Sequence, residues 1–143
     1  QVQGTLRCSC DDKNVYFLVE VLDRSLLRGD YATVYLSPDD SKSLTNGAKR
    51  IQVSMDGLKS TETYAGKWNN AEMGVEVKTY VCNDTNEDRI DNYGYIAEIS
   101  VPRSSLTISS GQVLVNFSIT DNKEEEAVSD VSSISRWIPV AGL

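Results

Sequence analysis

The sequence contains no histidine, and this absence excludes several kinds of catalytic and metal site. Without an imidazole there is no Ser-His-Asp or Cys-His nucleophile system, and the commonest protein ligand for transition metals is missing. Any catalytic role would have to use carboxylate, Lys, Tyr or Cys side chains. The composition therefore disfavours the most widespread hydrolytic mechanisms before any motif is considered.

Basic residues are scarce too. The chain of 143 residues has 14 Lys and Arg against 21 Asp and Glu, which gives a formal net charge of -7. Nucleic-acid binding requires clustered cations that displace counterions, whereas the longest charge run is the acidic segment 124–126. The chain also lacks the run of about 20 apolar residues that could span a bilayer. We therefore expect neither nucleic acid nor membrane as a partner.

Only three cysteines are present, Cys8, Cys10 and Cys82. An odd number leaves at least one thiol outside any disulfide within the chain. Either Cys82 is bridged to Cys8 or Cys10, or all three thiols are free, and the sequence leaves both arrangements open. A chain of this length can bury a core without disulfides, and no linker, repeat or low-complexity segment divides it. We therefore expect one domain over residues 1–143, whose start shows no signal-peptide pattern.

Apolar residues alternate with a period of two along most of the chain, and helical periodicity is almost absent. The predicted strands cover residues 15–22, 31–37, 50–55, 75–82, 95–101, 112–120 and 137–140. Turn signals separate them, such as Pro38-Asp39 and Asp56-Gly57. Because strands with one apolar face need a second sheet to cover that face, we expect an all-β fold, a two-sheet antiparallel β-sandwich of the jelly-roll kind.

The second face of three predicted strands carries hydrogen-bonding and aromatic side chains. These residues are Tyr31, Thr33, Tyr35, Arg50, Gln52, Asn116, Ser118 and Thr120. If the strands are neighbours, their amide, hydroxyl and aromatic groups form a surface that can offer fixed donors and acceptors to sugar hydroxyls. An ordinary solvated sheet face is the alternative, and periodicity alone favours it because antiparallel sheets routinely expose one side to water.

Four segments, in order, resemble motifs of family 9 carbohydrate-binding modules. They are CDDKNVYFLVEVLD at 10–23, GDYATVYLSP at 29–38, GYIAEISVPRSSL at 94–106 and VLVNFSITD at 113–121. Each is a short pattern that occurs by chance elsewhere, but four in the right order carry more weight than any one alone. The fold implied by the resemblance is the β-sandwich of that family, which agrees with the periodicity. The family's usual opening segment is absent, which points to a truncated or divergent start.

The resemblance implies non-catalytic sugar binding by a module joined to a glycoside hydrolase, in an extracellular or cell-surface protein. In that family a terminal sugar lies between two tryptophans, since the apolar face of a pyranose packs on aromatic rings. One tryptophan position corresponds to Trp137, and the other falls on the Leu-Leu-Arg segment 26–28, so Tyr31 or Trp68 is the candidate replacement. The family's strand glutamate is replaced by Thr33.

The predicted sugar site therefore combines the polar face with residues implied by the resemblance. Asn116 and Asp121 match the family's pattern, and its basic residue falls on Arg50 or Gln52. The full set is Tyr31, Thr33, Tyr35, Arg50, Gln52, Trp68, Asn116, Ser118, Asp121 and Trp137. Each also has a structural alternative: Trp68 as a cover for the sandwich edge, Trp137 as a core anchor, and Asp121 as a turn cap.

The segment 83–92 concentrates oxygen-bearing side chains. Asp84, Asn86 and Asp88 have the spacing that begins a calcium loop, and Asp91 follows them. Arg89 and Tyr95 stand where an EF-hand requires glycine and glutamate, so a true EF-hand is excluded. A structural Ca2+ is the one cofactor that the sequence suggests, and a solvated acidic hairpin is the alternative.

Two other functions stay open. The chain could be a structural or adhesive module of a multidomain surface protein that has lost sugar binding. It could also be a small glycosidase, which would need two carboxylates about 5 to 10 Å apart. Glu98 is an acid on an otherwise apolar strand, but the sequence ties no second acid to it. We therefore expect a binding module rather than an enzyme.

Overall fold

The computed structural model describes residues 2–23, 29–39, 44–82, 94–108, 111–120 and 138–143, and these residues form almost entirely β structure. The strands are β1 (Val2–Cys10), β2 (Asn14–Asp23), β3 (Tyr31–Ser37), β4 (Lys49–Ser54), β5 (Gly57–Tyr64), β6 (Trp68–Asn70), β7 (Glu76–Cys82), β8 (Gly94–Pro102), β9 (Val113–Thr120) and β10 (Ile138–Val140). A single turn of 3-10 helix, Arg103–Ser105, follows β8. Within these ranges no helix is long and apolar enough to cross a membrane.

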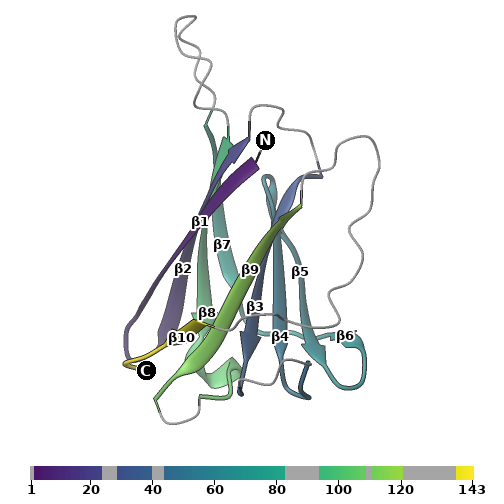
Figure 1. Ribbon diagram of the computed structural model, residues 1–143, viewed down its shortest axis with the longest axis vertical. Helices are drawn as coiled ribbons and strands as arrows, with labels where there is room; N and C mark the ends of the chain where they lie inside the picture. The colour runs from purple at the N-terminus through teal and green to yellow at the C-terminus, as the bar shows by residue number, and fades with distance from the viewer. Residues whose placement is uncertain (1, 24–28, 40–43, 83–93, 109–110, 121–137) are drawn as a thin grey trace, which may run out of the picture.

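The strands form two layers that face each other (Figure 1). The smaller sheet has the order β1-β2-β8-β7, and the larger sheet has the order β10-β9-β3-β4-β5-β6. Every neighbouring pair is antiparallel. The expected two-sheet antiparallel β-sandwich is confirmed.

The core lies between the two sheets and is built by the alternation seen in the sequence. On β2, Val15, Phe17, Val19 and Val21 are buried, because every second residue of a strand points to the same side. The other sheet contributes residues of the same kind, namely Ala32, Val34, Leu36, Ile51, Val53, Val113 and Val115. This packing fixes which side of the larger sheet faces away from the core.

Three strands were not expected from the sequence, namely β1, β5 and β6. β5 consists mostly of Ser, Thr, Lys and Glu residues and lacks apolar alternation, and in β1 glycine and cysteine occupy three of the five alternating positions, which weakens the apolar signal. They are strands because the neighbouring strand completes their backbone hydrogen bonds, as β4 does for β5. The expected hairpin turn at Asp56-Gly57 is present, with Gly57 at a φ of 132°, and β5 begins directly at this glycine.

All three cysteines are free thiols. Cys8 and Cys10 lie on β1 and Cys82 lies on β7, which are the two opposite edges of the smaller sheet. Three strand spacings of about 4.8 Å separate these edges, far beyond the Cα separation of about 7 Å that a disulfide tolerates. A bridge from Cys82 to Cys8 or Cys10 is therefore the arrangement that the fold excludes. Desolvation raises the pKa of the Cys8 thiol to about 11, although its side chain reaches the surface.

Candidate functional site

The strand register of the larger sheet brings the predicted polar residues together. Tyr35 on β3 lies opposite Asn116 on β9 and Arg50 on β4. Arg50 in turn lies opposite Glu62 on β5, and Glu62 lies opposite Asn70 on β6. One row of side chains thus crosses five neighbouring strands, on the side of the sheet that faces away from the core.

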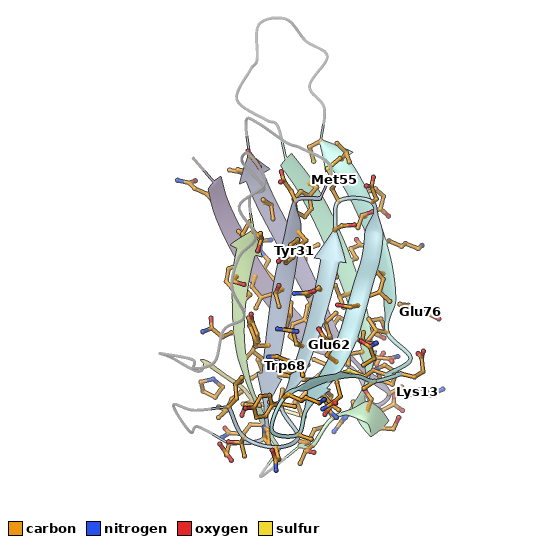
Figure 2. All side chains as sticks on the ribbon, turned by 90° about the vertical axis from the view of Figure 1, so that its right-hand side faces the viewer. Lys13, Tyr31, Met55, Glu62, Trp68 and Glu76 are labelled. Atoms are coloured by element: carbon orange, nitrogen blue, oxygen red, sulfur yellow. The ribbon has the colours of Figure 1, made fainter. Side chains whose placement is uncertain are left out.

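Two further rows run parallel to the first. The second contains Ser118, Thr33, Gln52 and Ser60, and the third contains Thr120, Tyr31 and Ser54. Together with Tyr64 and Trp68, which are paired between β5 and β6, the three rows form what we term the polar face. Figure 2 shows Tyr31, Glu62 and Trp68 following one another along this face, with Trp68 toward one end. The structure therefore places Tyr31, Thr33, Tyr35, Arg50, Gln52, Asn116, Ser118 and Trp68 on one surface.

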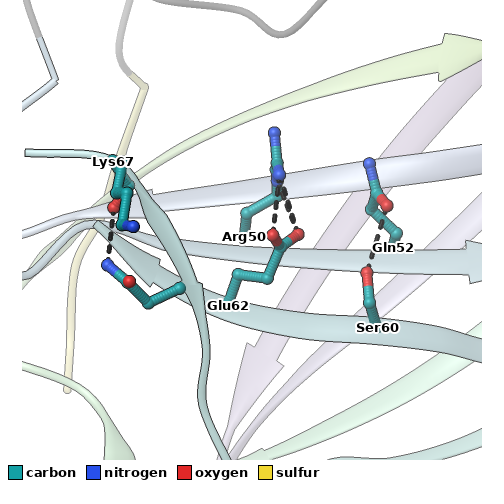
Figure 3. Close-up of polar contacts among 6 residues, drawn as sticks. Arg50, Gln52, Ser60, Glu62 and Lys67 are labelled. Carbon is teal, nitrogen blue, oxygen red and sulfur yellow. Dashed lines mark hydrogen bonds and ion pairs between the residues drawn. The ribbon is translucent and has the colours of Figure 1, made fainter. Parts of the chain in front are cut away.

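An ion pair lies at the centre of the polar face. The Arg50 Nε donates to Glu62 Oε1 at 2.9 Å, and Nη2 donates to Oε2 at 2.8 Å (Figure 3). The two side chains are only 7% and 13% exposed. Because both carboxylate oxygens accept from one planar guanidinium, the pair fixes the direction of both side chains.

Three aromatic rings gather beside this ion pair. The Arg50 guanidinium lies over the Trp68 ring, 4.4 Å from its centroid. Tyr64 meets Trp68 edge-on with centroids 5.3 Å apart, and Tyr35 lies tilted against it at 6.3 Å. Trp68 is partly exposed, so this ring reaches the surface while its position is set by three neighbours. Cation–π and edge-to-face contacts of this kind are each worth about 0.5 to 2 kcal/mol.

Burial divides the polar face into a supporting part and an accessible part. Thr33 and Tyr35 are only 1% and 5% exposed, so they support their neighbours. Gln52, Asn116 and Ser118 are partly exposed and can reach a ligand. The Gln52 Oε1 accepts from the Ser60 hydroxyl at 3.1 Å, which orients the amide and directs its NH2 group away from Ser60 (Figure 3).

Charge on the polar face is balanced. Among its residues that the structure describes, Arg50 is the cation and Glu62 is the anion, and the remaining members are hydroxyl, amide or aromatic residues. The net charge of -7 therefore resides elsewhere on the chain. A surface with aromatic rings, amides, hydroxyls and one closed ion pair is suited to an uncharged polar ligand.

Several predicted site residues lie outside the described ranges. These are Asp121 and Trp137 of the predicted sugar site, and Asp84, Asn86, Asp88 and Asp91 of the predicted calcium site. Their roles stay predictions. In the part of the chain that is described, no group of three or more Cys, Asp or Glu residues is arranged to hold a metal ion.

Sequence reasoning missed Ser54 at the end of β4 and four further members of the polar face, Ser60, Glu62, Tyr64 and Asn70. The latter four lie on β5 and β6, which lack apolar alternation. The signal that could have found them is the Asp56-Gly57 turn, because a hairpin fixes the register of the strand that follows it. The turn signals the strand but not this pairing, because without the bulge between Gln52 and Val53 the hairpin would pair Arg50 with Thr61 and put Glu62 on the opposite side of the sheet.

Glu98, the acid considered for a glycosidase, lies on the outer face of the smaller sheet. It pairs with Lys78 across β7 and β8, and with Glu76 it lines a shallow hollow that also includes Tyr16 and Ser100. The side chains of Glu76 and Glu98 are exposed. Because solvent surrounds both carboxylates alike, nothing there distinguishes a general acid from a nucleophile or base, so the site gives no support to the glycosidase.

Comparison with known proteins defines the class of fold. No protein-family profile matches the chain. The structure is similar to a family 9 carbohydrate-binding module from Caldicellulosiruptor kristjanssonii that was solved in complex with cellotriose, with a TM-score of 0.63 and 17% sequence identity. The match covers 97% of this chain and 64% of that chain. The chain therefore has the fold of a family 9 carbohydrate-binding module, as its motifs implied.

A sequence relative gives a second comparison. Over 121 residues the chain is 30% identical to the endo-1,4-beta-xylanase C of Paenibacillus barcinonensis. The alignment covers 84% of this chain but 10% of the enzyme, so the chain spans about a tenth of that relative's length.

Proposed function

We propose that the chain is a non-catalytic carbohydrate-binding module that holds a sugar on the polar face of its larger sheet. The observation that carries the proposal is the register, which gathers Trp68, Gln52, Asn116 and Ser118 on one surface beside a closed ion pair. The structural neighbour bound to cellotriose and the relationship to a xylanase support the same function.

The ligand class that we propose is a neutral oligosaccharide of β-1,4-linked glucose or xylose. Cellotriose is the sugar named with the structural neighbour, and a xylanase acts on a chain of the same linkage. Both sugars are uncharged, and both have pyranose rings with an apolar face of C–H groups. This chemistry corresponds to a surface that offers an aromatic ring together with neutral donors and acceptors.

Each accessible residue has a distinct role in this proposal. The partly exposed Trp68 ring takes the apolar face of one sugar unit, and Tyr64 and Arg50 hold the ring in place. The Gln52 amide and the Asn116 and Ser118 side chains bond to the sugar hydroxyls. Because these hydroxyls already bond to water, each exchanged hydrogen bond contributes only about 1 kcal/mol, and affinity should be modest.

We infer that the remaining predicted residues act around this surface. Trp137 is the proposed second aromatic platform, Asp121 and Tyr31 are proposed to line the site, and Ca2+ at 83–92 is a separate proposal for a structural ion. The parent protein is proposed to be extracellular or on the cell surface, with further domains joined to this one. The small share of the xylanase that this chain matches supports that arrangement.

Isothermal titration calorimetry with cellotriose and xylotriose tests the proposed function. We expect Trp68→Ala and Asn116→Ala each to weaken binding about tenfold or more, which corresponds to about 1.4 kcal/mol. The matched control is Tyr80→Ala, which removes an aromatic ring that is 50% exposed on the smaller sheet. Unchanged affinity in both polar-face variants, or a loss of binding in Tyr80→Ala, would overturn this site.

A further inference from the structure

Arg50 lies beside Trp68, the ring proposed to take the sugar, and is paired there with Glu62. Both carboxylate oxygens of Glu62 lie 2.8 to 2.9 Å from donors of the guanidinium. This two-bond geometry is the one by which arginine recognises any carboxylate, including that of a uronic acid. Glu62 therefore takes the place that a sugar carboxylate would need.

Electrostatics reinforces this exclusion. The two side chains are only 7% and 13% exposed, so solvent screens their charges poorly. A ligand carboxylate that approached Arg50 would also approach the negative charge of Glu62. A neutral hydroxymethyl group at the same place meets no such repulsion.

Glu62 also acts on the aromatic part of the site through Arg50. The guanidinium that Glu62 orients lies 4.4 Å from the centroid of the Trp68 ring. A change at Glu62 thus alters the group that supports the proposed sugar platform, while Glu62 itself need not touch the ligand.

We propose that Glu62 is the positioning residue that makes this site specific for neutral sugars and excludes uronic acids, by pairing with Arg50 beside Trp68. The proposal rests on the proposed function of the polar face. It adds a determinant of ligand choice that acts through Arg50.

The test compares cellotriose with the trisaccharide of β-1,4-linked glucuronic acid, which differs by a carboxylate in place of each C6 hydroxymethyl group. The proteins are the wild type, Glu62→Gln, and the double variant Arg50→Gln/Glu62→Gln. We expect the wild type to bind cellotriose at least about tenfold more tightly than the glucuronic acid trisaccharide. Glu62→Gln should reduce this preference about tenfold, because its affinity for the glucuronic acid trisaccharide increases. This increase in affinity should disappear in high salt. The double variant, which has no guanidinium at this position, should show no gain.

The outcomes separate the two proposals. If the wild type binds both trisaccharides equally, the specificity role of Glu62 is wrong and the sugar-binding function stands. If a folded Glu62→Gln keeps the full preference of the wild type, or the double variant gains as much as the single variant, the role is also wrong. If the wild type binds neither these sugars nor xylotriose, the proposed function fails and this inference fails with it. Equal binding of the two trisaccharides by the wild type would refute the inference even if Glu62→Gln does not fold.

Discussion

Removing Glu62 should cost the protein more stability than an ordinary surface ion pair would. In Glu62→Ala the Arg50 charge, in a residue that is only 6% exposed, would lose a carboxylate that accepts two hydrogen bonds. Leaving one partner of a buried pair without the other typically costs about 3 to 5 kcal/mol. The Glu62 side chain is 13% exposed, so water can partly replace its carboxylate in Glu62→Ala. We therefore expect Glu62→Ala to lower the free energy of unfolding by about 2 to 4 kcal/mol.

The double-mutant cycle isolates the pair. Arg50→Ala removes the ion pair and also the contact with the Trp68 ring, which is worth about 0.5 to 2 kcal/mol. We therefore expect Arg50→Ala to lower the free energy of unfolding by an amount comparable to that of Glu62→Ala. The double variant should be less destabilised than the sum of the two single variants, with a coupling energy of about 1 to 3 kcal/mol.

Urea unfolding followed by circular dichroism measures these differences. With an m value of about 1 to 3 kcal/mol/M, a loss of about 3 kcal/mol lowers the midpoint by about 1 to 3 M. If Glu62→Ala lowers the free energy of unfolding by less than about 1 kcal/mol, the pair contributes no more than an exposed salt bridge does. That result, or additive single variants, would refute the view that the pair is buried and mutually dependent.

The remaining predictions concern the smaller sheet. Gly94→Ala should lower the free energy of unfolding by about 2 kcal/mol or more, because the added Cβ would lie 1.8 Å from the backbone oxygen of Val21; thermal unfolding within 1 °C of the wild type would contradict this. Hydrogen bonds from Tyr16 and from two backbone N–H groups lower the pKa of Asp11 from 3.8. A carboxyl whose pKa is lowered by folding stabilises the protein above its unfolded pKa, so the stability advantage of the wild type over Asp11→Asn should be complete above about pH 5 and decline as the pH falls below 3.8. Urea midpoints of the wild type and Asp11→Asn at pH 7 and pH 2 measure this stability advantage. An advantage that is equal at pH 7 and pH 2 would exclude a stabilising role of the Asp11 charge.

The parts of the fold that the sequence could predict are those that bury apolar side chains on one face. β2, β3, β4, β7, β8 and β9 all carry such alternation, because every second residue of each strand must face the opposite sheet. β6 has only three residues, too few to show a period, and in β1 glycine and cysteine occupy several of the alternating positions. Edge position alone does not explain the missed strands, because β7 is also an edge strand and its alternation was identified, whereas the missed β5 lies inside the larger sheet.

The candidate site shows the same division. Alternation on β3, β4 and β9 correctly put Tyr35, Arg50 and Asn116 on one side of the sheet. It could not say that Arg50 is paired, because its partner Glu62 comes from β5, whose polar sequence gave no strand signal. Nor could it say that Thr33 and Tyr35 are buried on a face that their alternation marks as polar.

The pairing of Arg50 with Glu62 changes what the composition implies about the ligand. A net charge of -7 suggests at first that the chain repels anionic sugars as a whole. At physiological ionic strength, however, exposed charges are screened beyond about 8 Å, so distant acidic turns contribute little at the polar face. Among the described residues, the charged members of the polar face are the paired Arg50 and Glu62, and ligand choice there depends on them. If Glu62 were neutral, the same acidic protein would present a cationic site, so this one residue informs the choice between neutral and acidic sugars more than the overall charge does.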